Sequence, residues 1–202
     1  MKVKTLFLIC FLSITCLLNA ADKPVIQIHT DNSSLIFRIA DNGRLYQSYL
    51  GKKLSHETDI SHLPHGTEAY ITHGMEDYFE PAIHILHNDG NPSLLLKYVS
   101  HETKAVSQGV NETIITLGDD KYPVTVKLHY VTYPAEDIIK TYTEISHKEK
   151  KPVVLHQYAS SMLHLNRAKY YLTEFAGDWA HEANISDQPL EFGKKVLDTK
   201  LG

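Results

Sequence analysis

The feature that most constrains the fold of this chain is an almost unbroken succession of short segments in which apolar and polar residues alternate. VIQIHT, SLIFRIA and YPVTVKLHYVTY are examples, and each is rich in β-branched or aromatic residues. A period of two turns one side of a segment toward a core and the other toward solvent, which is typical of half-buried antiparallel strands. Turn signals separate the segments, such as DNG at Asp41 to Gly43. The pattern therefore indicates a β-protein.

Length and composition fit a globular domain. The chain has 202 residues, of which 43% are hydrophobic and 22% charged. We predict an all-β fold, a large antiparallel two-sheet β-sandwich (a supersandwich), with the long runs between Tyr122 and Leu165 as its central strands. The stretch 56–82 is polar, irregular and rich in histidine, and it is predicted to form a long functional or packing loop.

The N-terminus has the pattern of a secretory signal peptide. Lys2 and Lys4 precede the apolar run LFLICFLSITCLL, and small residues follow near Ala20 and Ala21. We predict a signal peptide at 1–21, a mature domain at 22–202, and a secreted or periplasmic protein. A membrane anchor is the alternative, but the run is short for a transmembrane helix, so no membrane partner is predicted.

Removal of this segment changes the chemistry open to the chain. The net charge becomes (20 − 2) − 24 = −6, because two lysines and no acidic residues leave. Cys10 and Cys16 leave as well, which excludes disulfides, a thiol nucleophile and a Cys-ligated zinc site. The acidic balance and the lack of a basic stripe argue against nucleic acid as a partner.

The 13 histidines raise the question of a metal site. His84 and His87 lie three apart in a predicted strand, so their side chains point to opposite faces. No HExxH motif occurs. We therefore predict scattered histidines and no metal.

Acidic residues gather at two places, Glu76, Asp77 and Glu80 in one segment and Asp119 and Asp120 in a turn. Glycoside hydrolysis needs two opposed carboxyl groups, and neither group supplies a demonstrable pair. No nucleophile elbow and no phosphate-binding loop occurs. We predict no catalytic residue and no cofactor within this chain.

The single tryptophan, Trp179, lies in the polar segment YLTEFAGDWAHEANI. An aromatic side chain in a polar loop can offer a flat face to the C–H side of a sugar. The alternative is a tryptophan that closes the end of the sandwich or packs on a neighbouring domain. Spacing alone favours this alternative over a sugar contact.

Two ordered sets of residues carry a family resemblance. The earlier set is Gly74, Asp77, Tyr78, Pro81 and Ala82, and the later set is Gly177, Trp179, Glu182, Pro189, Leu190 and Gly193. The earlier set resembles G-x-x-D-[FY]-x-x-P-A, and the later resembles G-x-W-x-x-E followed by P-L-x-x-G. Through these motifs the chain is similar to the N-terminal domain of family 36 glycoside hydrolases, the bacterial and fungal alpha-galactosidases.

The resemblance implies a β-supersandwich followed by a (β/α)8 barrel that bears two catalytic aspartates of a retaining enzyme. That barrel would lie beyond this sequence, and Val196, Leu197 and Leu201 indicate a strand still in progress at its end. The resemblance places Trp179 at the wall of a galactose pocket. We therefore expect a non-catalytic domain of an alpha-galactosidase that meets alpha-galactosides through the parent enzyme and helps it form a homo-oligomer. A stand-alone carbohydrate-binding or interaction domain, or a fragment without function, are the alternatives.

Overall fold

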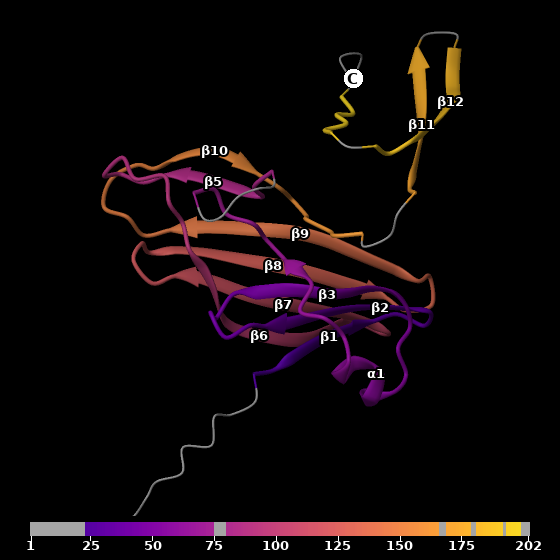
Figure 1. Cartoon of the computed structure of the whole chain (residues 1–202), viewed down its shortest axis with the longest axis horizontal. Helices are drawn as coiled ribbons and strands as arrows, with labels where there is room; N and C mark the ends of the chain where they lie inside the picture. The colour runs from indigo at the N-terminus through magenta and orange to yellow at the C-terminus, as the bar shows by residue number, and fades with distance from the viewer. Residues whose placement is uncertain (1–22, 75–79, 166–168, 179–180, 192, 199–202) are drawn as a thin grey trace, which may run out of the picture.

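The computed structural model describes residues 23–74, 80–165, 169–178, 181–191 and 193–198. The predicted signal peptide lies outside these residues. Within them the chain forms twelve strands and one short helix, so the predicted all-β fold is confirmed. The two larger sheets are antiparallel and lie face to face as the two layers of a sandwich (Figure 1).

The first layer is a four-stranded antiparallel sheet in the order β1-β2-β3-β4. The turn from β2 to β3 contains Gly43 with φ +80°, a conformation that glycine adopts without strain, as the DNG signal predicts. Its strands are β1 (Val25–His29), β2 (Ser33–Ile39), β3 (Leu45–Lys52) and β4 (Thr67–Glu68).

The second layer is a four-stranded meander in the order β6-β7-β8-β9. Its inner strands are β7 and β8, whereas β9 has no further partner strand in this sheet, so only part of the Tyr122–Leu165 region is central. The strands are β6 (Leu96–Ser107), β7 (Val110–Asp119), β8 (Val124–Tyr133) and β9 (Ile138–His147).

Two strand pairs and a helix complete the architecture. β5 (Ile83–Leu86) pairs with β10 (Val154–Tyr158), and β11 (Tyr171–Asp178) pairs with β12 (His181–Pro189). The β11–β12 hairpin stands away from the sandwich (Figure 1). In the described part of the predicted long loop, the chain forms α1 (Glu57–Ser61) and β4.

The hydrophobic core lies between the two four-stranded sheets and extends under β5. The rings of Phe37 from β2 and Tyr130 from β8 meet across the layers, with centroids 5.2 Å apart. The residues of β8 that face the core follow the predicted period of two. They are Val124, Val126, Leu128 and Tyr130.

Two predicted strands differ from the structure. The run predicted to extend through Leu165 is a strand only as far as Tyr158, because the chain then leaves β5 and is held by side chains of other segments. Val196 and Leu197 belong to no strand, and both are exposed. Their apolar character alone does not supply the partner that a strand needs.

Candidate functional site

Trp179, the residue predicted to contact sugar, lies outside the described residues. The strands on either side of it are described, and Asp178 and His181 are the last paired positions of the hairpin. Gly177 and Glu182 both lie within strands, so part of the polar segment predicted to be a loop is strand. Antiparallel pairing satisfies the backbone of this polar segment, which is why it forms strands despite its composition.

Large apolar side chains lie on one face of the hairpin, on either side of the polar pair Thr173 and Asp187. Phe175 of β11 lies opposite Ile185 of β12, and their side chains are 69% and 68% exposed. Tyr171, four residues before Phe175 in β11 and on the same face, is 64% exposed. Exposed apolar side chains grouped in this way are candidates for a contact surface.

The segment that leads to the hairpin is fixed to the sandwich by a buried amide. We call residues 159–165 and 169–170 the strap. The Gln47 side chain of β3 is fully buried; its Nε2 donates to the His164 carbonyl at 2.7 Å, and its Oε1 accepts from the His164 backbone N–H at 3.2 Å. The His164 ring lies 2.8 Å from the Glu68 carbonyl, so the strap is held at both backbone and side chain.

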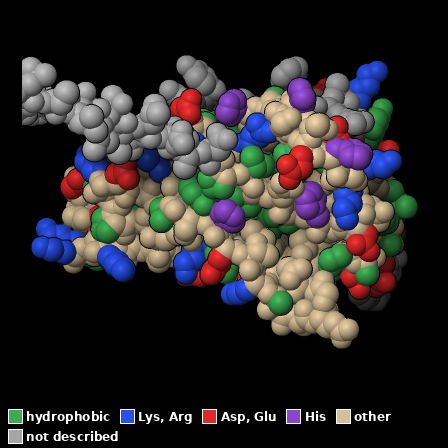
Figure 2. All heavy atoms as spheres, turned by 90° about the horizontal axis from the view of Figure 1, so that it is seen from below, with side chains coloured by type: hydrophobic (Ala, Val, Ile, Leu, Met, Phe, Trp, Pro, Cys, Tyr) green, Lys and Arg blue, Asp and Glu red, His purple; other side chains and the backbone are tan. Residues whose placement is uncertain are grey.

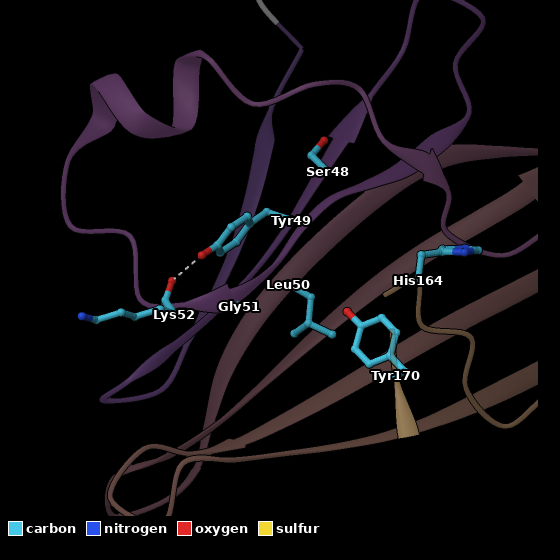
Figure 3. A pocket seen from close by; sticks show the side chains of 7 residues that line it. All are labelled: Ser48, Tyr49, Leu50, Gly51, Lys52, His164 and Tyr170. Atoms are coloured by element: carbon cyan, nitrogen blue, oxygen red, sulfur yellow. Dashed lines mark hydrogen bonds between the residues drawn. The ribbon is translucent and has the colours of Figure 1, made fainter. Parts of the chain in front are cut away.

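A pocket of about 410 Å³ lies between β3 and the strap. Figure 3 shows the Tyr49 and Tyr170 rings on either side of Leu50, with Gly51 and Lys52 at one end. Tyr170 immediately precedes β11, so the pocket lies at the base of the hairpin. Nothing in the sequence pattern marked these residues, because β3 and the strap are more than a hundred positions apart.

The carboxylates considered for catalysis have structural partners where they are described. Asp119 accepts hydrogen bonds from the backbone N–H groups of Lys121 and Tyr122, and Asp120 forms an ion pair with Lys97. A hydrogen bond from Lys194 lowers the pKa of the Glu80 carboxyl. Glu76 and Asp77 lie outside the described residues.

A buried carboxylate lies on the outer face of the β6–β9 sheet. Hydrogen bonds from Tyr142, His129 and Lys104 lower the pKa of the Glu112 carboxyl to about 2. The Tyr142 hydroxyl donates at 2.6 Å, and the Tyr142 ring stacks on His129 with centroids 4.2 Å apart. Full ionisation and three partners identify Glu112 as a structural anion, not a proton donor in the neutral pH range.

The histidines are distributed over several surroundings. His87 is buried, and its Nδ1 lies 2.7 Å from Glu149 while its ring stacks on Tyr122. His84 instead stacks on His73 with centroids 3.8 Å apart. Figure 2 shows the same scatter on one face of the molecule, with lysines and acidic side chains interspersed. No group of three potential ligands among the described residues is arranged to hold a metal ion.

Comparison with known proteins identifies the fold and the domain. The family model described as "Glycosyl hydrolase family 36 N-terminal domain" matches residues 42–202. The chain belongs to this family. The match to the glycoside hydrolase 36 N-terminal domain covers β3 to β12, including the second layer, the pocket and the hairpin, whereas β1 and β2 precede its first matched residue.

Curated relatives of this family 36 domain are alpha-galactosidases by name. "Probable alpha-galactosidase G" of Aspergillus terreus is 24% identical over 142 residues, which cover 64% of this chain and 20% of that protein. "Alpha-galactosidase C" of Emericella nidulans is 25% identical over 142 residues, covering 64% and 19%. The chain thus spans about a fifth of the length of the curated relatives it matches.

Solved structures share the fold of this domain. Alpha-galactosidase AgaA from Geobacillus stearothermophilus, in complex with raffinose, matches with a TM-score of 0.75 at 19% identity, over 84% of this chain and 28% of that one. The galactosidase domain of AgaSK matches with a TM-score of 0.74 at 20% identity, over the same shares. At such identities the similarity is one of fold.

The family motif residues occupy two regions of the structure. Gly74, the first residue of the earlier motif, has φ +83°, and Pro81 and Ala82 at the end of this motif lead into β5. The Ala82 carbonyl accepts a hydrogen bond from the backbone N–H of Ala159, the first residue of the strap. Asp77 and Tyr78 of this motif lie outside the described residues, as Trp179 does. Both described motif regions are thus linked to the strap or to the hairpin that follows it.

No helix among the described residues has the length and apolar character needed to cross a membrane.

Proposed function

We propose that this chain is the non-catalytic N-terminal domain of a retaining alpha-galactosidase that hydrolyses terminal alpha-galactosyl residues of oligosaccharides. The family match over residues 42–202 is the observation that carries the proposal. The curated relatives are named alpha-galactosidases, and two structures of similar fold were solved with raffinose and with stachyose bound. Alpha-galactosides of this kind are therefore the proposed substrates of the longer protein.

In this proposal, the two catalytic carboxyl groups belong to a barrel outside this chain. Retaining hydrolysis uses two carboxyl groups about 5–5.5 Å apart, one as nucleophile and one as acid and base. The described carboxylates Asp119, Asp120 and Glu112 already serve turns and ion pairs. This chain would support the barrel and lend Trp179 to the sugar pocket.

The proposal for Trp179 is tested by Trp179→Ala in the longer enzyme, with both activity and stability measured. Loss of a sugar-stacking face should cost about 1–2 kcal/mol, or roughly a tenfold fall in kcat/KM, with little change in Tm. A buried core tryptophan would instead cost about 3–5 kcal/mol of stability. A large fall in Tm with unchanged kcat/KM would overturn the assignment.

The proposal also predicts that the isolated chain has no glycosidase activity. Purified alone, it should not turn over an aryl alpha-galactoside, because the catalytic pair belongs to the barrel. Turnover that disappears when one carboxylate of this chain is replaced would contradict the non-catalytic assignment.

The proposed location is outside the cytoplasm, by export through residues 1–21. To test the export, the full sequence is expressed in a bacterial host, and the N-terminal sequence of the mature protein is determined. Cleavage near Ala20 or Ala21 is expected, and an intact N-terminus in the soluble cytoplasmic fraction would contradict it.

A second candidate function, a carbohydrate-binding domain that acts without catalysis, is favoured by one observation. The pocket between β3 and the strap is built by this chain alone and needs no barrel. The two functions are distinguished by whether a longer enzyme loses activity when Trp179 is changed.

A further inference from the structure

We propose that the pocket between β3 and the strap is a carbohydrate subsite that takes one sugar unit of a neutral oligosaccharide. This inference rests on the proposed function for its class of ligand, and on the pocket itself for its location. It concerns residues separate from Trp179 and from any catalytic pair. The pocket residues that carry the argument are Tyr49, Gly51, Lys52, His164 and Tyr170.

Part of the pocket wall is held in place, which limits the affinity that a ligand would lose to ordering. One wall is β3, and the His164 part of the other wall is held by the two hydrogen bonds between Gln47 and the His164 backbone. The Tyr49 hydroxyl donates to the Lys52 carbonyl at 2.8 Å, which fixes the ring orientation.

Gly51 makes room for this orientation of Tyr49. A Cβ at position 51 would lie 2.9 Å from the Tyr49 hydroxyl oxygen and 3.1 Å from the ring carbon that bears it. Any larger residue would therefore push the ring out of its place at the pocket wall. The pocket thus depends on a glycine that the strand itself does not need.

The lining has the two kinds of surface that a sugar presents. The Tyr170 ring, which lies beside Leu50, offers an apolar face to C–H groups, whereas the Tyr49 ring points toward the Lys52 carbonyl (Figure 3). The Tyr170 hydroxyl and the Lys52 ammonium have no hydrogen-bond partner within the described part of the chain, so both can bind sugar hydroxyls. The volume of about 410 Å³ lies within the usual range of small-molecule sites, about 300–1,000 Å³.

The charge of the lining favours a neutral ligand over a polyanion. Burial lowers the pKa of the His164 imidazole, so this ring stays neutral at neutral pH. Lys52 is then the single cation among the residues that line the pocket. Binding of a polyanion normally rests on several cations.

The test is a titration of the ¹⁵N-labelled chain with raffinose, followed by heteronuclear NMR. Binding should shift the amide signals of Ser48 to Lys52, His164 and Tyr170, with a Kd on the order of 1 mM. Tyr170→Ala should weaken binding at least tenfold. Tyr171→Ala is the matched control, because it removes the same side chain one position later, on the exposed face of the hairpin, and should leave Kd unchanged.

The outcomes separate this inference from the proposed function. Equal weakening by Tyr170→Ala and Tyr171→Ala, or shifts confined to β11 and β12, would overturn the pocket assignment and place the sugar on the hairpin. The absence of shifts at the pocket up to about 50 mM raffinose, far above an ordinary weak Kd, would overturn it as well. Neither result would affect the fall in kcat/KM expected for Trp179→Ala, on which the galactosidase proposal stands.

Discussion

The Tyr142 hydroxyl donates a 2.6 Å hydrogen bond to Glu112 across the intervening strand β8. The two residues belong to β9 and β7, and the His129 ring of β8 lies between them with its Nδ1 2.9 Å from the same carboxylate oxygen. Three adjacent strands are thereby joined on their outer face by side chains as well as by backbone ladders.

This relationship predicts an acid-sensitive contribution to stability. The pKa of Glu112 is about 2 in the folded chain against 4.5 ordinarily, so the contribution is full above about pH 4.5 and is lost as the pH falls toward 2. Glu112→Gln should cost about 3 kcal/mol at pH 7, at roughly 1.4 kcal/mol per pKa unit. Urea unfolding at pH 7, 4 and 3 measures this cost. The difference in the free energy of unfolding between wild type and Glu112→Gln should become smaller as the pH falls.

The control for this prediction is Glu102→Gln, an exposed carboxylate on the neighbouring strand β6. It should change stability by less than about 0.5 kcal/mol at every pH. If Glu112→Gln kept the same penalty at pH 3 as at pH 7, its effect would come from packing and not from the charge.

A second prediction concerns Gly66, which precedes β4. It has φ +82°, and a Cβ there would lie 1.9 Å from the Gln47 carbonyl oxygen. Gly66→Ala should therefore cost well over about 3 kcal/mol or prevent folding, since strain of the left-handed backbone and an overpacked contact add. Gly90 has the same φ of +82° with nothing within 4 Å, so Gly90→Ala should cost only about 1–2 kcal/mol. Equal losses in Tm would refute the steric account.

A third prediction follows from the buried amide of Gln47. Gln47→Leu keeps the volume but leaves the N–H and carbonyl of His164 without their partners, which should cost about 2–4 kcal/mol. Hydrogen exchange should quicken at His164 and its neighbours in the strap before it changes in the two large sheets. Gln27→Leu, on the exposed side of β1, is the control. Unchanged protection at the strap in the Gln47 variant would show that other contacts hold it.

The apolar face of the hairpin leads to a fourth prediction. Alone in solution the chain should associate and bind a hydrophobic dye, because Tyr171, Phe175 and Ile185 are left uncovered. The double variant Phe175→Thr and Ile185→Thr should reduce both, while Ala176→Thr on the opposite face should not. Sedimentation velocity over a range of concentrations measures the association. A monodisperse wild-type monomer without dye binding would count against the exposed face as a contact surface.

The strands could be predicted from sequence wherever one face is buried. The residues of β8 at even positions lie in the core and those at odd positions face outward, because a buried face forces a period of two on the sequence. The burial of Glu112 could not be predicted in this way. An acidic residue in a strand is expected to face water, yet Glu112 is only 6% exposed, because Tyr142, His129 and Lys104 surround it.

The pocket could not be predicted, because its walls are distant in sequence. Gln47 and His164 are 117 positions apart, and a single glutamine in a strand carries no signal of such a partner. Tyr49 and Tyr170 are likewise far apart in the sequence, and no motif connects them. Trp179 was singled out as the one tryptophan in a polar segment, and the family resemblance placed it at a galactose pocket. Its role stays a prediction because it lies outside the described residues.

The manner in which the strap is held has a consequence for how this domain can diverge. Gln47 binds the main-chain atoms of His164, Tyr70 donates to the carbonyl of Ala159, and Thr143 donates to the carbonyl of Ser160. Main-chain atoms are the same for every residue type, so apart from His164, whose ring also contacts the Glu68 carbonyl, strap residues can be substituted while the path of the strap is preserved. Selection should act on Gln47, Tyr70 and Thr143, whose side chains hold the strap. Sequences of distant family members should then align more readily at these three positions than along the strap itself.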